Sequence, residues 1–212
     1  MRKPRLYKSR DPEAVKQALL DAVGAILKEN GHQGLGVNRV SLRAHINKGL
    51  IYWYYTSYNH LVKTYIKGKD FWRPIFEKFQ LREPPKEEEL PGYITAIFQE
   101  QFQCFFGDKE MQKLILWQVS EPNPLLKEVS DERELEGAKI MALTDPHFKD
   151  SEIDFRSVVG LVLGGIYNMV WHASNNKSTV IGIDINNERD REKFRKAIGH
   201  VITAVWKLAE KV

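Results

Sequence analysis

Two short segments with apolar residues at helical spacing, residues 37–43 and 48–54, are separated only by residues 44–47. This link is too short for anything but a tight corner between two helices. Asn47 is a good N-cap, so the second segment is predicted to begin as a helix at Lys48. Together the two segments are predicted to form a helix-turn-helix.

Helices are also predicted on both sides of this motif. Asp11 is placed as an N-cap with Pro12 at the first helical position, and helical apolar spacing continues until Asn30-Gly31 stops the helix. A further helix is predicted to begin at Ser57 and to run on toward Phe79. Beyond the proline-rich and acidic stretch 81–91, helical patterns cover residues 93–106, 109–120, 125–143, 153–173 and 190–212. Only residues 178–183 are predicted to be briefly extended, so the predicted fold class is all-α.

The composition is that of a folded globular protein, since 42% of the residues are apolar and 28% are charged. The longest apolar run, residues 158–170, is interrupted by glycines and Asn168 and falls short of the roughly 20 residues that a membrane span requires. No membrane partner is expected, and because no apolar stretch with a cleavage site follows the basic N-terminus, we expect a cytoplasmic protein. The single cysteine, Cys104, excludes an internal disulfide and a multi-cysteine zinc site.

The formal charge of +4 is distributed unevenly along the chain. Residues 1–80 hold 15 Lys or Arg and 6 Asp or Glu, whereas residues 81–212 hold 17 and 22. A basic N-terminal third is typical of a protein that contacts phosphates, because the release of condensed counterions drives such binding. The alternative interpretation is a solvated basic face.

The stretch from Gly31 to Leu61 resembles the DNA-binding domain of the TetR (TetR/AcrR) family in order, spacing and residue type. The matching residues are Gly31, Val40-Ser41, Ala44-His45-Ile46-Asn47, residues 49–55 and residues 57–61. His45 stands where the family has a corner glycine, a position of positive φ that a histidine tolerates moderately well. Tyr58 replaces a lysine that holds a phosphate in the family, and Leu50 stands where threonine is frequent.

The resemblance implies a double-stranded DNA partner, read in the major groove by the second helix of the motif. The predicted DNA-binding residues are Asn38, Arg43, Asn47, Lys48, Gly49, Leu50, Tyr52, Trp53, Tyr54 and Tyr58. Base contacts are implied for Lys48, Gly49, Tyr52 and Trp53. The hydroxyls of Tyr54 and Tyr58 are expected to reach phosphates, and the basic arm, residues 2–10, is expected to follow the backbone or a minor groove. The small core that holds the reading helix is predicted to consist of Val37, Val40, Ala44, Ile46, Ile51 and Tyr55.

The chain is predicted to hold two domains. Residues 1–56 form the helix-turn-helix DNA-binding domain, and residues 57–212 form a helical ligand-binding and dimerisation domain. Apolar residues of the last predicted helix recur at spacings of 4 and 3 residues, the seam pattern of helices packed side by side. The predicted homodimer interface comprises Gly160, Gly164, Phe194, Ile198, Val201, Val205 and Leu208. Two reading helices held about 34–36 Å apart read successive major grooves of a near-palindromic operator; packing within one chain is the alternative interpretation of the seam.

The middle helices are rich in aromatic residues, which either fill a core or line an apolar cavity with a few polar groups. The residues predicted to bind an unidentified small-molecule inducer are Phe98, Gln101, Phe102, Phe105, Trp117, Gln118, Tyr167, Asn168, Trp171 and His172. In this family a ligand is expected to favour the state that does not bind DNA. The predicted function is therefore that of a ligand-released transcriptional repressor, without a cofactor.

Two other classes of function remain. An enzyme is not predicted, because the six histidines are scattered and no nucleophile motif or phosphate-cradling glycine loop occurs; Cys104 with a distant histidine is the remaining candidate for catalysis. The second alternative is a helical interaction protein that keeps this scaffold but has lost DNA binding, which the departures at Leu50 and Tyr58 favour.

Overall fold

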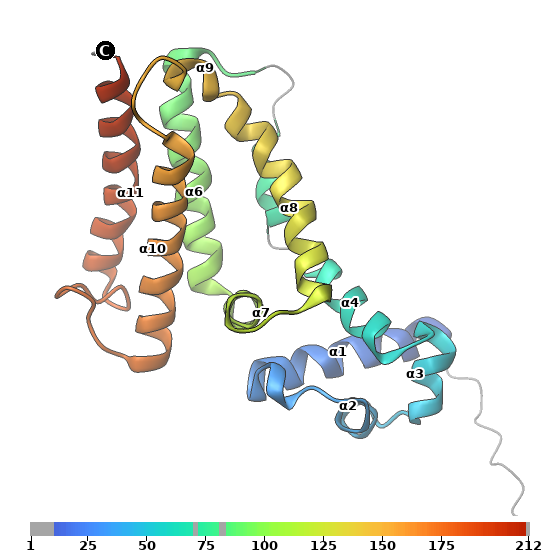
Figure 1. Cartoon of the computed structure of the whole chain (residues 1–212). Coiled ribbons are helices and arrows are strands. Elements are labelled where there is room, and N and C mark those ends of the chain that lie inside the picture. The colour runs from blue at the N-terminus through green and yellow to red at the C-terminus, as the bar shows by residue number, and fades with distance from the viewer. Residues whose placement is uncertain (1–10, 70–71, 81–83, 211–212) are drawn as a thin grey trace, which may run out of the picture. The chain divides into compact units, whose positions relative to one another are not determined.

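The computed structural model describes residues 11–69, 72–80 and 84–210 and divides by its internal contacts into two compact units (Figure 1). The described residues of the N-terminal unit are 11–69 and 113–129. Those of the C-terminal unit are 72–80, 84–112 and 130–210. Helices α7 (Lys109–Ser120) and α8 (Pro124–Ala142) contribute residues to both units. The predicted functional boundary between residues 56 and 57 stays a prediction.

The N-terminal unit contains the helices that the sequence predicts around the tight corner. They are α1 (Pro12–Asn30), the short 3-10 helix η1 (His32–Gly34), α2 (Val37–Ala44), α3 (Lys48–Tyr55) and α4 (Tyr58–Gly68). The predicted beginning and end of α1 are confirmed. The Asp11 carboxylate accepts a hydrogen bond of 3.0 Å from the Glu13 backbone N–H, and Gly31 ends the helix with a φ of +67°. The basic arm, residues 2–10, lies outside the described residues.

The core of the N-terminal unit joins α1 to the three helices that follow it. Leu19, Val23 and Leu27 of α1 are fully buried, as are Val40 of α2 and Leu61 of α4. These apolar side chains lie at helical spacing on α1, so one face of this helix serves as the platform on which the others pack. Because burial of apolar surface is the main stabilising term, this platform fixes the positions of α2 and α4, and α3 in turn packs on these two helices.

The C-terminal unit is helical as well. It contains α5 (Trp72–Lys78), the 3-10 helix η2 (Glu87–Glu89), α6 (Leu90–Gly107), α9 (Asp145–Phe148), α10 (Phe155–Asn176) and α11 (Glu188–Ala209). Helices α6, α10 and α11 pack side by side (Figure 1). The extended segment predicted at residues 178–183 is reduced to one isolated bridge between Val180 and Ile183, so the described residues form no named strand and the all-α prediction is confirmed.

The predicted helix from Ser57 toward Phe79 is wrong in its extent. Helix α4 ends at Gly68, and a separate helix α5 begins at Trp72. Glycine is a poor helix former, which explains an end at this position. Among the described residues, no helix combines the length and the apolar character needed to cross a membrane.

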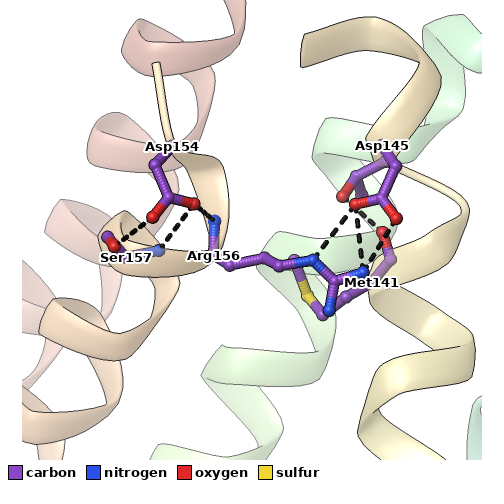
Figure 2. Close-up of polar contacts among 6 residues, drawn as sticks. Met141, Asp145, Asp154, Arg156 and Ser157 are labelled. Carbon is purple, nitrogen blue, oxygen red and sulfur yellow. Dashed lines mark hydrogen bonds and ion pairs between the residues drawn. The ribbon is translucent and has the colours of Figure 1, made fainter. Parts of the chain in front are cut away.

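Helix α10 is anchored at its first turn by two carboxylates (Figure 2). Asp154 is its N-cap and accepts hydrogen bonds from the backbone N–H groups of Arg156 (3.2 Å) and Ser157 (3.3 Å) as well as from the Ser157 hydroxyl. The Arg156 guanidinium extends to Asp145 of α9, with 2.8 Å between Nη2 and Oδ2. The Ser157 hydroxyl and backbone N–H hold the pKa of the Asp154 carboxyl below its usual value.

The capping carboxylate makes the stability of this region depend on pH. Since the pKa of Asp154 is lowered by folding, its stabilisation is present above the ordinary pKa of an aspartate and is lost as the pH falls through the lowered value. Asp154→Ala is expected to lower the thermal unfolding midpoint at neutral pH and to match the wild-type protein at acidic pH. Circular dichroism melts across this range measure the difference, with the exposed Asp150→Ala as the control. A difference that persists unchanged in acid contradicts the capping role.

Candidate functional site

The corner between α2 and α3 is held by local hydrogen bonds. His45 adopts a φ of +53° in the left-handed region, as expected for the residue in place of a corner glycine. The Ser41 hydroxyl donates to the backbone carbonyl of Ile46 at 2.6 Å. Asn47 caps α3, its side-chain oxygen accepting from the Gly49 backbone N–H at 2.8 Å, so the predicted N-cap is confirmed.

The inner side of α3 is fixed against the rest of the N-terminal unit. Ile51 is fully buried, and Tyr55 is buried with its hydroxyl donating to the backbone carbonyl of Lys16 on α1 at 3.1 Å. Val40 and Ile46 complete the buried contacts around the corner. Of the six residues predicted for the small core, Val37 and Ala44 are half-buried and the other four are buried. With one side immobilised in this way, α3 presents its other side outward.

Most of the predicted DNA-binding residues lie on that outward surface. Asn38, Arg43, Asn47, Lys48, Gly49, Tyr52 and Trp53 are exposed, whereas Leu50 and Tyr54 are half-buried. Trp53 is 80% exposed and Tyr52 is 50% exposed, which is unusual for large aromatic side chains in a folded protein. The structure therefore brings the predicted base-contacting residues together at one accessible helix face.

The electrostatic surroundings of this face are positive. No Asp or Glu occurs between Glu29 and Asp70, while Arg39, Arg43 and Lys48 all lie within the motif. Arg39 donates to the backbone carbonyl of Gly34 at 3.0 Å, an interaction that does not neutralise its positive charge. Such a surface attracts phosphates and repels basic partners.

Arg43 has a partner that the sequence did not reveal. Its guanidinium forms a two-pronged ion pair with Glu29 of α1, with 3.0 Å from Nη1 to Oε2 and 2.5 Å from Nη2 to Oε1. Both side chains are about half exposed, at 47% and 48%. A DNA contact by Arg43 therefore has to compete with its ion pair to Glu29. This ion pair is weak because both side chains are exposed to solvent.

The phosphate contact of Tyr58 stays a prediction, which the position of its hydroxyl does not favour. The Tyr58 hydroxyl is buried and has no hydrogen-bond partner among the described residues. Burial also raises the pKa of Tyr58 to about 12. A hydroxyl that is shielded from solvent cannot reach a phosphate, and no pattern in the sequence distinguishes this tyrosine from its exposed neighbours.

Sequence reasoning also missed Leu42. This side chain is 75% exposed on α2, one helical turn after Asn38. The core predicted for this helix comprised Val37, Val40 and Ala44, and no role was predicted for Leu42. Its position beside Asn38 makes it a neighbour of the outward surface of the motif.

Trp117 of α7, predicted as a ligand contact, has partners within the N-terminal unit. Its ring stacks on His32 with 5.3 Å between centroids and 3° between planes. Its indole N–H donates to Glu121 at 2.7 Å, and the same carboxylate lies 3.3 Å from the His32 Nε2. Gln118 is half-buried beside it. For both residues a role in ligand binding stays a prediction.

The other predicted ligand residues form an aromatic cluster inside the C-terminal unit. Phe98, Gln101, Phe102 and Phe105 of α6 are buried. The Phe105 ring lies 4.6 Å from the ring of Tyr167 and 5.7 Å from that of Trp171, measured between centroids. The structure thus brings these side chains of α6 and α10 together.

Gln101 is the polar centre of this aromatic cluster. It is fully buried, and its side-chain N–H donates to the Tyr167 hydroxyl at 3.4 Å, while its carbonyl oxygen has no partner among the described residues. Turning the amide over exchanges its two ends and leaves the other end unpaired instead. A buried amide with one free end destabilises the protein unless another group pairs with it.

Asn168 and His172 do not supply the polar groups that were predicted for this cluster. Asn168 is exposed on α10, because it lies one residue beyond Tyr167 and so points away from α6. His172 is engaged near the end of α10, with ring nitrogens 3.2 Å from Asn176 Nδ2 and 2.7 Å from Ser178 Oγ. The cluster's polar atoms come from Gln101 and Tyr167 instead.

The predicted dimer residues divide into two sets. Ile198 is buried within the chain, and the ring of Phe194 lies 5.1 Å from that of Phe102, so these two face the unit's own core. Because α11 packs along α6 in the same chain, this packing does not favour an interface role for them, and that role stays a prediction. Val201 and Leu208 are exposed and Val205 is half-buried.

The exposed set continues on α10. Gly160, Leu161 and Gly164 are exposed, Leu161 at 78%. A Cβ atom at Gly160 or Gly164 would meet no other atom within 4 Å, so packing within the chain does not require glycine there. Helices α10 and α11, which contact each other, therefore both carry apolar or small residues that this chain leaves exposed.

The alternative of cysteine catalysis finds no support in the geometry. Burial and the nearby Glu100 carboxylate raise the pKa of the Cys104 thiol, which keeps it protonated at neutral pH. Among the described residues, no group of three His, Cys, Asp or Glu side chains is arranged to hold a metal ion.

Comparisons with known proteins identify the fold. No protein-family model matches the sequence, and no curated protein matches it. Solved structures do match. A TetR family transcription regulator from Marinobacter aquaeolei has 13% identity and a TM-score of 0.61, with 92% of this chain and 95% of that chain covered.

Two further neighbours cover nearly the whole chain. GusR from Salmonella enterica has 18% identity and a TM-score of 0.59, with 95% of this chain and 100% of that chain covered. The transcriptional regulator FadR from Bacillus subtilis was solved in complex with stearoyl-CoA. It has 16% identity and a TM-score of 0.56, with 91% of this chain and 96% of that chain covered. At this level of identity the likeness concerns the fold, which is that of TetR-family regulators.

Proposed function

We propose that this protein is a sequence-specific DNA-binding transcriptional regulator that acts as a ligand-released repressor. The observation that carries the proposal is α3, a capped helix whose inner side is fixed by Ile51 and Tyr55 and whose outer side exposes Lys48, Tyr52 and Trp53. It lies in a stretch free of acidic residues. A rigid helix with a positive, accessible face suits insertion into the major groove.

Within the groove, Lys48 is the side chain that donates hydrogen bonds to guanine O6 and N7. Its place in the first turn of α3, next to the Asn47 cap, directs it toward base edges, as recognition helices use their N-terminal residues. Asn38 on α2 and the half-buried Tyr54 supply hydrogen bonds to the sugar-phosphate backbone of the DNA. Arg43 also contacts the DNA backbone, after its guanidinium releases Glu29 and pairs with a phosphate instead.

A small molecule is proposed to bind at the aromatic cluster around Gln101. The free end of the Gln101 amide and the Tyr167 hydroxyl offer hydrogen bonds inside otherwise apolar surroundings. A ligand with an apolar body and one polar group satisfies this arrangement, which agrees with a fold in which FadR from Bacillus subtilis holds stearoyl-CoA. Its binding releases DNA by favouring the other conformation of the dimer.

The active form is proposed to be a homodimer through the uncovered face of α10 and α11. One helix-turn-helix contacts only a few base pairs, whereas two related by a two-fold axis read a near-palindromic operator with half-sites about 34–36 Å apart. The exposed Leu161, Val201 and Leu208 are the apolar residues that such an interface would cover.

A second candidate is a helical interaction protein of the same fold that does not bind DNA. Two observations favour it: the Tyr58 hydroxyl is buried rather than available to a phosphate, and Arg43 is already paired with Glu29. This candidate predicts no affinity for any duplex.

One experiment distinguishes the DNA-binding regulator from the interaction protein. The full-length protein selects duplexes from a randomised DNA pool, and mobility shifts then measure its affinity for them. We expect an enriched duplex whose affinity falls steeply with salt, by about 1000-fold between 50 and 200 mM when six phosphates are contacted. Lys48→Ala is expected to weaken binding by about tenfold or more.

The matched control is Lys139→Ala, which removes an exposed lysine of α8 outside the motif. It is expected to leave the affinity within about twofold of the wild-type value. A pool from which no duplex is enriched at low salt contradicts the regulator and supports the interaction protein.

A further inference from the structure

The outward side of α3 is aromatic rather than polar. Tyr52 and Trp53 are the exposed aromatic residues of the described chain, and Trp53 is exposed to 80%. The exposure of these two residues follows from the register of the helix, since Ile51 and Tyr55 occupy its buried side. An indole left in water on a helix that carries a lysine and no acidic residue indicates a surface that is covered when a partner binds.

The same helix lacks the side chains that read bases through paired hydrogen bonds. Residues 48–55 contain no Arg, Asn, Gln, Asp or Glu, so α3 has none of the residue types suited to two-pronged contacts except Lys48. Gly49 adds no side chain at all. Beyond the Lys48 contact with guanine, discrimination between base pairs by the side chains of α3 therefore depends on its exposed aromatic residues, which can detect a difference in apolar surface.

The major groove offers one such difference, the methyl group on C5 of thymine. An indole contacts a methyl group through dispersion and by removing apolar surface from water, with no need for a matched donor and acceptor. We infer that Trp53 recognises thymine methyl groups and thereby contributes to the choice of operator sequence, beside the hydrogen-bonded base contact that Lys48 provides from α3. This inference rests on the proposed DNA binding.

Deoxyuridine tests the inference directly, because uracil keeps the hydrogen-bonding groups of thymine and lacks only the methyl group. The probe is a duplex enriched from the randomised pool by the full-length protein, resynthesised with each thymine replaced in turn by deoxyuridine. Fluorescence anisotropy then gives the affinity of each duplex. At one or more thymines of each half-site we expect the wild-type protein to bind about fourfold more weakly, the effect of losing one buried methyl group.

The contribution of Trp53 is isolated by combining the two changes. Trp53→Ala is expected to weaken binding to the thymine duplex and to remove the difference between thymine and uracil at those positions. Because Trp53 is exposed, this substitution leaves the buried side of α3 intact, which circular dichroism verifies. The matched control is Leu135→Ala, an exposed apolar residue of α8, which should keep the full uracil effect.

The outcomes separate the inference from the proposed function. An enriched duplex with no uracil effect at any position overturns methyl recognition and leaves DNA binding in place. A uracil effect of the same size in wild type and Trp53→Ala assigns the methyl contact to another residue and overturns the role of Trp53. A pool without any enriched duplex overturns the proposed function and this inference with it.

Discussion

Replacing Val201 and Leu208 together with glutamate is expected to convert the proposed homodimer into monomers. Both side chains are exposed on α11, at 43% and 54%, next to the glycine-containing face of α10. In a two-fold interface each substitution occurs twice, so four carboxylates would lose water against apolar surface and against one another. Affinity for an enriched two-half-site duplex is expected to fall by about 100-fold, because the two motifs no longer bind as one unit.

The oligomeric state is measured by sedimentation at micromolar concentration and the affinity by anisotropy. Thr203→Glu is the matched control, since this exposed position of the same helix lies two residues from Val201 and so nearly opposite to it. It is expected to remain dimeric. A double variant that sediments with the mass of the wild-type protein shows that the face of α10 and α11 is not the interface.

The motif around the corner was predictable because its determinants are local. The Asp11 and Asn47 caps each act within two residues, and His45 adopts the left-handed conformation through bonds to its own turn. Capping preferences and apolar spacing are properties of a few neighbouring residues, which a sequence displays directly. The order and approximate extent of the helices followed from the same signals.

Contacts between distant residues were not predictable in this way. Arg43 pairs with Glu29, 14 residues earlier in the chain, and the Trp117 ring stacks on His32 of η1. The Tyr58 hydroxyl is buried although Tyr52 and Trp53, a few residues earlier, are exposed. Each of these depends on how helices pack, which local patterns do not determine.

Helix α11 shows most clearly what a sequence pattern does not predict about the faces of a helix. The residues chosen from a repeat of alternating 4 and 3 spacings include Ile198, which is buried within the chain, and Leu208, which is exposed. The buried series is Ile198, Ile202 and Trp206, so apolar residues occupy two sides of one helix. A repeat pattern identifies an apolar stripe but does not say whether the chain itself or a second copy covers it.

Truncating Phe102 to alanine is expected to lower the free energy of unfolding of the C-terminal unit by about 3–5 kcal/mol. The ring is fully buried and lies 5.1 Å from Phe194 of α11 and 6.3 Å from Phe106. Its removal takes away apolar contacts between α6 and α11 and leaves a cavity that a helix pair cannot fully close. Urea unfolding followed by tryptophan fluorescence measures the loss.

Two neighbouring substitutions decide what a measured loss means. Phe106→Ala removes a half-buried ring that lies against Arg191, with 4.8 Å from guanidinium to centroid, and is expected to cost less. Gln101→Leu removes the amide with an unpaired end and keeps a similar volume, so it is expected to stabilise the unit. If Phe102→Ala instead loses less than about 1 kcal/mol, the ring does not fill a packed core but borders open space. The loss of unfolding free energy therefore indicates how tightly the aromatic cluster around Gln101 is packed. A small loss means that the cluster leaves space for a ligand.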